Sequence, residues 1–148
     1  MSGRFLGLDP GERRIGVAIS DATGTIATPV EFIDTRTRNH EQRLRDLCTE
    51  WEISEIVVGL PVSLDGTEGP AAVRSRGFGE RVAEITDLPV LFHDERFTTV
   101  TAEQALLEGG VKRRSRTSKR DQVAAAVMLQ GFLDRRRNES GINDQDDS

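Results

Sequence analysis

The sequence predicts an α/β protein built on a mixed five-stranded sheet, with helices on both faces. Three short β-rich runs joined by tight turns open the chain, which is typical of an antiparallel meander. Two later apolar runs each follow a segment of helical periodicity, and parallel strands need such crossovers. The chain has 148 residues, 36% hydrophobic and 30% charged, which suits one domain with its own core.

The strands are predicted from short apolar runs bounded by turn signals. The first run is followed by the short turn Pro10–Arg13 and by a second run, so these two strands should form a hairpin. The fourth run is continuously apolar, as in a strand covered on both faces, and Pro61 ends it. The predicted strands are 4–9, 14–21, 25–33, 55–60 and 88–94.

The helices are predicted from apolar residues that recur every three or four positions. Leu44, Leu47, Cys48 and Trp51 share one face of the first helix, which makes Cys48 a core residue rather than a reactive thiol. The last helix contains AAAVMLQGFL, which is apolar on most sides and should be largely buried. The predicted helices are one around 44–51, then 71–86, 99–108 and 118–137.

Composition excludes several classes of protein. A single cysteine allows neither an internal disulfide nor a Cys/His zinc cluster. No basic region precedes a long apolar run at the N-terminus, and no stretch reaches the ~18 apolar residues of a membrane span. We therefore expect a soluble, cytoplasmic protein whose domain covers residues 1–138. The acidic segment 139–148 is predicted to be a disordered tail.

Three acids stand out by their predicted positions. Asp9 ends the first strand, Glu95 follows the fifth, and Asp121 lies in the first turn of the last helix. Sites in open sheets gather outside the carboxyl ends of strands, where Asp9 and Glu95 both lie. Each acid also has a structural interpretation: a turn for Asp9, a solvated loop for Glu95, and a capping box from Ser118 to Asp121.

The helical phase of Asp121 argues against a simple cap. At 100° per residue, it shares a face with Ala124, Ala125, Met128 and Phe132. A buried carboxylate is costly unless it is paired or bound to a metal ion. A cation shared by the three acids explains the pattern, and hard oxygen ligands select Mg²⁺ or Mn²⁺. Two such ions held by carboxylates are the apparatus of phosphodiester hydrolysis.

A basic segment, KRRSRTSKR at 112–120, immediately precedes the last of these acids, although the net charge of the chain is −5. Such a segment either contacts the phosphates of a nucleic acid or is only a solvated surface. Its place beside a candidate metal ligand favours phosphate contact.

Four segments together resemble a known family: GLDPGERRIGVAISD, IVVGLPVSLDGTEGP, HDERFTT and SKRDQVAAAVMLQGFL. In this order they resemble the YqgF family of the ribonuclease H-like superfamily, which is related to RuvC-type Holliday junction resolvases. The resemblance covers about residues 4–137. It implies a ribonuclease H-like fold and a divalent-metal nuclease that matures the 5′ end of the 16S ribosomal RNA precursor. Resolvase-like cleavage of junction DNA is the alternative.

The same resemblance implies that Asp9, Glu95 and Asp121 are the metal ligands and catalytic acids. RuvC-type resolvases place an acid at the end of the fourth strand, whereas that strand ends here in Gly59-Leu60-Pro61. Glu95 must therefore substitute from the next strand. Secondary candidates for contact with backbone phosphate are Arg14, Arg96, Thr98, Lys112, Arg113 and Lys119. Thr98 is equally well explained as a helix cap.

Two other classes of function stay open. Actin-like sugar kinases also begin with a strand, an acid and a Gly-rich turn, but they need two such domains to clamp ATP. A non-catalytic RNA-binding or ribosome-assembly factor would carry the same acids without turnover. The lack of Tyr and the core position of Trp51 predict few exposed aromatic side chains for stacking on bases. The oligomeric state is open between monomer and homodimer.

Overall fold

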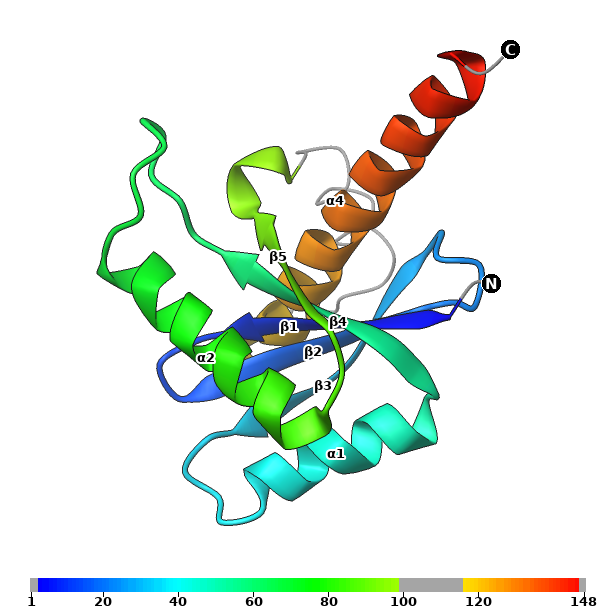
Figure 1. Cartoon of the computed structure of the whole chain (residues 1–148). Coiled ribbons are helices and arrows are strands. Elements are labelled where there is room, and N and C mark those ends of the chain that lie inside the picture. Colours follow the sequence, from blue (N-terminus) through cyan, green and yellow to red (C-terminus); the bar gives the residue numbers. More distant parts are fainter. Residues whose placement is uncertain (1–2, 99–115, 147–148) are drawn as a thin grey trace.

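The computed structural model describes the backbone of residues 3–98 and 116–146, and the side chains of residues 3–98 and 123–139. The predicted helix at 99–108 and the basic residues 112–115 lie outside these ranges. The described elements are β1 (Arg4–Pro10), β2 (Arg14–Ser20), β3 (Ala27–Asp34), α1 (His40–Glu50), β4 (Ile53–Leu60), α2 (Pro70–Thr86), β5 (Val90–Asp94), the 3₁₀ turn η1 (Glu95–Phe97) and α4 (Arg116–Asp146) (Figure 1).

The five strands form one mixed sheet in the order β3-β2-β1-β4-β5, which confirms the predicted architecture. The first three strands pair antiparallel as a meander, whereas β4 and β5 add to β1 in parallel. The strand bounds differ from the predicted ones by at most two residues. The first strand of the chain is therefore the centre of the sheet, and the carboxyl ends of β1, β4 and β5 lie along one edge.

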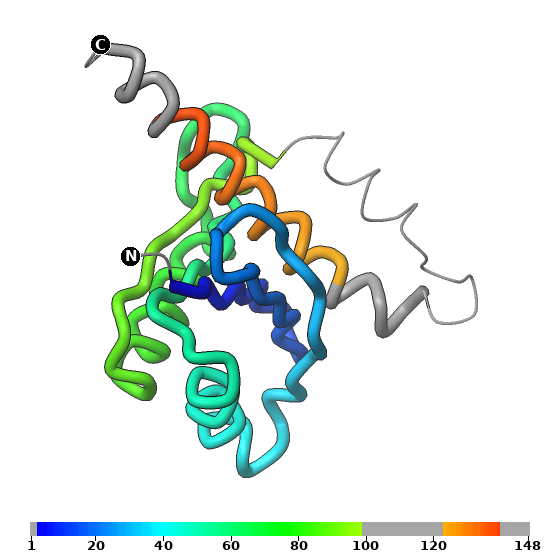
Figure 2. The backbone as a smooth tube through the Cα atoms, turned by 90° about the vertical axis from the view of Figure 1, so that its right-hand side faces the viewer, coloured from blue at the N-terminus to red at the C-terminus, as the bar shows by residue number. Residues whose placement is uncertain are grey.

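The two faces of the sheet are covered by different helices: α1 and α2 lie on one side and α4 on the other (Figures 1 and 2). Along β1, Leu6 and Leu8 join the core under α1 and α2, whereas Phe5 joins the core under α4. This alternation follows from the two-residue period of a strand. Gly7 lets α4 approach closely, since a Cβ there would lie 2.9 Å from Leu129 Cβ.

The last helix is longer than predicted at both ends. It begins at Arg116, so Ser118 is inside the helix rather than at its N-cap, and the capping-box interpretation of Asp121 is wrong. The backbone of residues 139–146 continues the helix, although composition predicts disorder there. An exposed ion pair one turn apart, between Arg135 and Glu139 at 3.2 Å, favours this continuation. Within the described residues, no helix has the length and apolarity needed to cross a bilayer.

Candidate active site

Asp9 lies inside strand β1, one residue before its end. It pairs with Gly16 across the antiparallel ladder, and the turn itself begins at Gly11, whose N–H donates to the Arg14 carbonyl at 2.8 Å. The interpretation of Asp9 as a turn residue is therefore wrong. Because Asp9 has the same parity along the strand as Phe5, its half-buried side chain faces the α4 side of the sheet.

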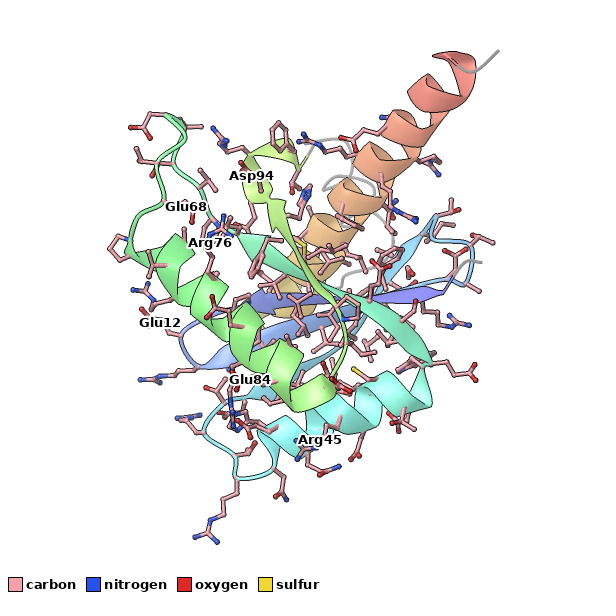
Figure 3. All side chains as sticks on the ribbon, in the orientation of Figure 1. Glu12, Arg45, Glu68, Arg76, Glu84 and Asp94 are labelled. Atoms are coloured by element: carbon pink, nitrogen blue, oxygen red, sulfur yellow. The ribbon has the colours of Figure 1, made fainter. Side chains whose placement is uncertain are left out.

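Glu95 is the first residue of η1, directly after β5. The turn is ordered by Asp94, whose carboxylate accepts a hydrogen bond from the Arg96 backbone N–H at 2.9 Å. Figure 3 labels Asp94 where β5 meets η1. The Glu95 side chain is half-buried and hydrogen-bonded to Asp9, so its interpretation as part of a solvated loop is wrong. The sheet brings together two acids that are far apart in the sequence.

The two carboxyl groups meet above Gly59, near the end of β4. An ideal Cβ built at Gly59 would lie 2.7 Å from Glu95 Oε1 and 3.5 Å from Asp9 Oδ1. Met128 of α4 closes the same space, with its Cγ 3.1 Å from that Cβ position. Gly59 therefore contributes to the site because it has no side chain, which leaves space for the two carboxyl groups. We did not predict this role from the sequence. The observation that could have indicated it is that the fourth strand ends without an acid.

The pKa of the Glu95 carboxyl group is well above its ordinary value. Burial raises the pKa of Glu95 to about 7, and the nearby charge of Asp9 acts in the same direction. The hydrogen bond to Asp9 and the charge of Asp94 favour the protonated form of Glu95 further and so also raise its pKa. Without a cation, Glu95 therefore stays largely protonated up to a pH of about 7.

Asp121 lies in α4 two turns before Met128, about 10 Å along the helix axis and on the same side of the helix. Ala125 and Met128 are buried against the sheet, which confirms that this side of α4 faces it. Ala124 is exposed and Phe132 only half-buried, so the apolar stripe is narrower than predicted. The Asp121 side chain lies outside the described ones, and its place as third ligand stays a prediction. Among the described side chains, no group of three metal-ligating residues occurs.

The structure describes only some of the residues that were predicted to contact phosphate, and these lie in different surroundings. The Arg14 guanidinium lies over the Phe32 ring, 4.8 Å from its centroid, at the start of β2. Arg96 is bound to the carboxylate of Asp94, with Nη2 2.6 Å from Oδ2. Its guanidinium therefore orders η1, and a phosphate would have to compete for it. Lys112 and Arg113, with the side chain of Lys119, lie outside the described parts.

Thr98 follows η1 and faces the protein interior. Its backbone N–H donates to the Glu95 carbonyl at 3.1 Å, which makes it the C-cap of the turn. Its Oγ1 is buried without a hydrogen-bond partner in the described structure, and it lies 3.3 Å from the ideal Cβ position of Gly131 on α4. This hydroxyl packs η1 against α4.

Phe97 was not among the predicted site residues. It is 46% exposed and lies in the same turn as Glu95. Sequence reasoning weighed only Tyr and Trp as stacking residues and found them scarce. The sequence feature that could have indicated Phe97 is its position two residues after the candidate acid Glu95.

The sheet has this mixed order, acids lie at its first strand and beside its fifth, and α4 covers the face that Asp9 points to. This arrangement is a ribonuclease H-like fold. The structure of Thermus thermophilus RuvC in complex with a Holliday junction substrate has the same fold. The TM-score is 0.54 at 13% identity, covering 88% of this chain and 94% of that one.

The particular family follows from the sequence. The family model described as "RuvX: Holliday junction resolvase" matches residues 3–135, and the chain belongs to this family, which is the YqgF family of the sequence resemblance. A relative from Ruegeria sp. (strain TM1040) is 45% identical over 134 residues, covering 90% of this chain and 85% of its own. One from Streptomyces coelicolor is 48% identical over 137 residues, covering 91% and 82%. Both carry the name "Putative pre-16S rRNA nuclease".

Proposed function

We propose that this protein is a divalent-metal-dependent nuclease that hydrolyses phosphodiester bonds of structured RNA, and that it processes the 5′ end of the 16S ribosomal RNA precursor. The observation that carries the proposal is the meeting of Asp9 and Glu95 above Gly59 on a ribonuclease H-like sheet. The names of the relatives support the substrate. We place this activity in the cytoplasm, in a monomer or homodimer.

The described residues fit a divalent cation. Both side chains offer hard carboxylate oxygens, which suit Mg²⁺ or Mn²⁺. Burial and the charge of Asp9 raise the pKa of Glu95, and a bound cation would act against both by favouring its charged form. Asp9, Glu95 and Asp121 would hold the metal, with two ions in the full site. When bound, such ions supply activation of water and stabilisation of the leaving oxygen.

The remaining residues prepare and support this site. Gly59 leaves the space in which the Glu95 carboxylate stands, and the pair of Asp94 and Arg96 orders the turn that carries Glu95. The basic segment 112–120 and Arg14 would bind the phosphate backbone of the substrate through charge. Because backbone contacts do not read sequence, the shape of the RNA selects the site of cleavage.

A Holliday junction resolvase-like activity is the second candidate. The family description and the shared fold with RuvC favour it. Against it stands Gly59, because β4 carries no acid where RuvC-type enzymes have one. A non-catalytic ribosome-assembly factor is the third candidate, and it predicts binding of RNA without turnover.

The decisive experiment is incubation of the protein with labelled precursor ribosomal RNA, single-stranded RNA and a four-way DNA junction, in Mg²⁺ or in Mn²⁺. We expect cleavage of the precursor and loss of cleavage in Asp9→Asn. Asp46→Asn makes the same change at an exposed position of α1 and should cleave normally. Preferred cleavage of the junction would support the resolvase. Undiminished cleavage in excess EDTA would contradict a metal mechanism, and binding without any cleavage would support the assembly factor.

A further inference from the structure

A cavity of about 320 Å³ lies beside the candidate active site, between β5, η1 and α4. Its lining includes His93, Asp94, Phe97, Phe132, Arg135 and Glu139. Phe97 belongs to the same short turn as Glu95, so whatever fills this cavity lies close to the reacting phosphate. The volume is at the small end of the ~300–1,000 Å³ range of small-ligand sites, which suits one flat group rather than a strand.

The outer part of the cavity is a stacking platform. The Phe97 ring is 46% exposed, and the guanidinium carbon of Arg135 lies 3.7 Å from its centroid. An ion pair to Glu139 at 3.2 Å holds Arg135 in place. Aromatic rings and guanidinium planes are the two surfaces on which proteins stack unpaired bases.

The inner wall of the cavity is aromatic. His93 meets the edge of Phe132 at a centroid distance of 6.1 Å and an interplanar angle of 88°. The His93 side chain is only 3% exposed, and its Nε2 is covered, 3.2 Å from the ideal Cβ position of Gly131 on α4. The wall therefore offers ring surface to a flat group.

The charges of the lining balance and do not favour a phosphate. The two acids, Asp94 and Glu139, stand beside two arginines, Arg135 and Arg136. Each acid is also in an ion pair, Asp94 with Arg96 and Glu139 with Arg135, so the lining offers no clear excess of positive charge for a phosphate group. A nucleobase needs no such charge, and its amino groups donate hydrogen bonds that carboxylates accept. The cavity thus differs from the basic segment, which suits the backbone.

We propose that this cavity binds one unstacked nucleobase of the substrate, from a nucleotide next to the cleaved bond, with Phe97 as its stacking surface. The inference rests on the proposed function, since it takes nucleic acid as the substrate. It deepens that function by adding a preference for an unpaired nucleotide at the cleavage site.

The test is a binding measurement that needs no cleavage. RNA hairpins carry the fluorescent base 2-aminopurine at one of several successive unpaired positions, and the protein is titrated in EDTA. We expect strong quenching at one position only, because a stacked 2-aminopurine is quenched. Phe97→Leu, which keeps apolar volume but cannot stack, should lose this quenching and weaken binding roughly ten-fold. Phe97→Trp should retain the quenching.

Val73→Ala, at a 62% exposed position of α2, is the matched control and should leave the quenching intact. Thermal melts check that each variant is folded. RNA binding with equal quenching at all positions, or with quenching unchanged in Phe97→Leu, would overturn the base pocket alone. Failure of the wild-type protein to bind any of the hairpins would overturn the proposed function as well.

Discussion

The Glu95 carboxylate stands in the space that a side chain at Gly59 would fill, with Oε1 2.7 Å from the ideal Cβ position. The fourth strand therefore supplies room, and the turn after the fifth strand supplies the acid. The parallel register explains how Glu95 reaches this space, because Leu60 of β4 lies beside Asp94 of β5, one residue before Glu95. The Glu95 carboxylate thus lies above β4, although the residue itself follows β5.

Gly59→Ala should abolish or strongly reduce cleavage while the protein stays folded. The new methyl group would press on Glu95 Oε1 at 2.7 Å and on Met128 Cγ at 3.1 Å, so the carboxylate must move. Overpacking of this kind costs about 1–3 kcal/mol of stability. Single-turnover cleavage and urea melts measure the two effects.

Gly77→Ala is the control for this prediction. A Cβ at Gly77 would meet nothing within 4 Å, and the residue lies inside α2. Stability should therefore rise by about 1 kcal/mol, with cleavage unchanged. Wild-type activity in Gly59→Ala would show that the placing of Glu95 above β4 does not matter for the reaction.

The contribution of Glu95 to the stability of the metal-free protein should fall as pH rises from about 4.5 to 7. The folded-state pKa of Glu95 is about 7, above its ordinary value of 4.5, so the folded state binds more protons than the unfolded state in this window. The slope is at most about 1.4 kcal/mol per pH unit. Glu95→Gln should lack this component in urea melts performed in EDTA.

The quantity to compare is the difference in unfolding free energy between the wild type and Glu95→Gln at each pH. Burial lowers the pKa of His93, so this residue changes stability in the opposite direction, and its effect cancels because both proteins contain it. Added Mg²⁺ should stabilise the wild type more at pH 8 than at pH 6, because binding requires the deprotonated pair. Parallel pH profiles for the wild type and Glu95→Gln in EDTA would contradict a shared proton.

If Asp121 is the third ligand, Asp121→Asn should leave the metal-free protein as stable as the wild type, or more stable, because a negative charge next to Asp9 and Glu95 is removed. Cleavage and stabilisation by Mg²⁺ should both fall. Denaturant melts in EDTA and in Mg²⁺, with Asp46→Asn as control, measure this. Equal destabilisation in both buffers, with cleavage preserved, would remove Asp121 from the site.

Replacement of Lys112, Arg113 and Arg114 by Ala should weaken binding to all nucleic acids alike. The slope of log K against log salt should become shallower by up to about 0.7–0.9 per lost phosphate contact. A slope equal to that of the wild type would identify the segment as solvated surface. The control removes three other exposed arginines: Arg38, Arg45 and Arg74.

Removal of residues 140–148 should leave the melting temperature and cleavage unchanged. Among the described side chains of α4, Leu133 is the last one in the core, and those after Asp134 are exposed. The truncation keeps Glu139 and its ion pair with Arg135. A fall of the melting temperature by several degrees would show that this end of the helix docks on the domain.

The sequence predicted the strands and the buried helix face because both follow from repeating apolar positions. It also predicted that Asp9 and Glu95 lie close together, because strand ends in an open sheet converge. The role of Gly59 was missed because it depends on the lack of a side chain, and the repeat of apolar residues along a strand does not reveal such a role. The engagement of Arg96 with Asp94 was missed for another reason: it depends on a three-residue turn, too short for any repeating pattern.

The contact between the first strands and helix α4 has a consequence for protein synthesis. The Ala27 N–H donates to the Gln130 side chain across a separation of 103 residues, and Leu129 packs directly on Gly7 of the first strand. A nascent chain whose helix α4 has not yet left the ribosome therefore leaves one face of the central strand uncovered. Such a chain, or one terminated before α4, lacks the wall behind Asp9 and should be hydrolytically inert.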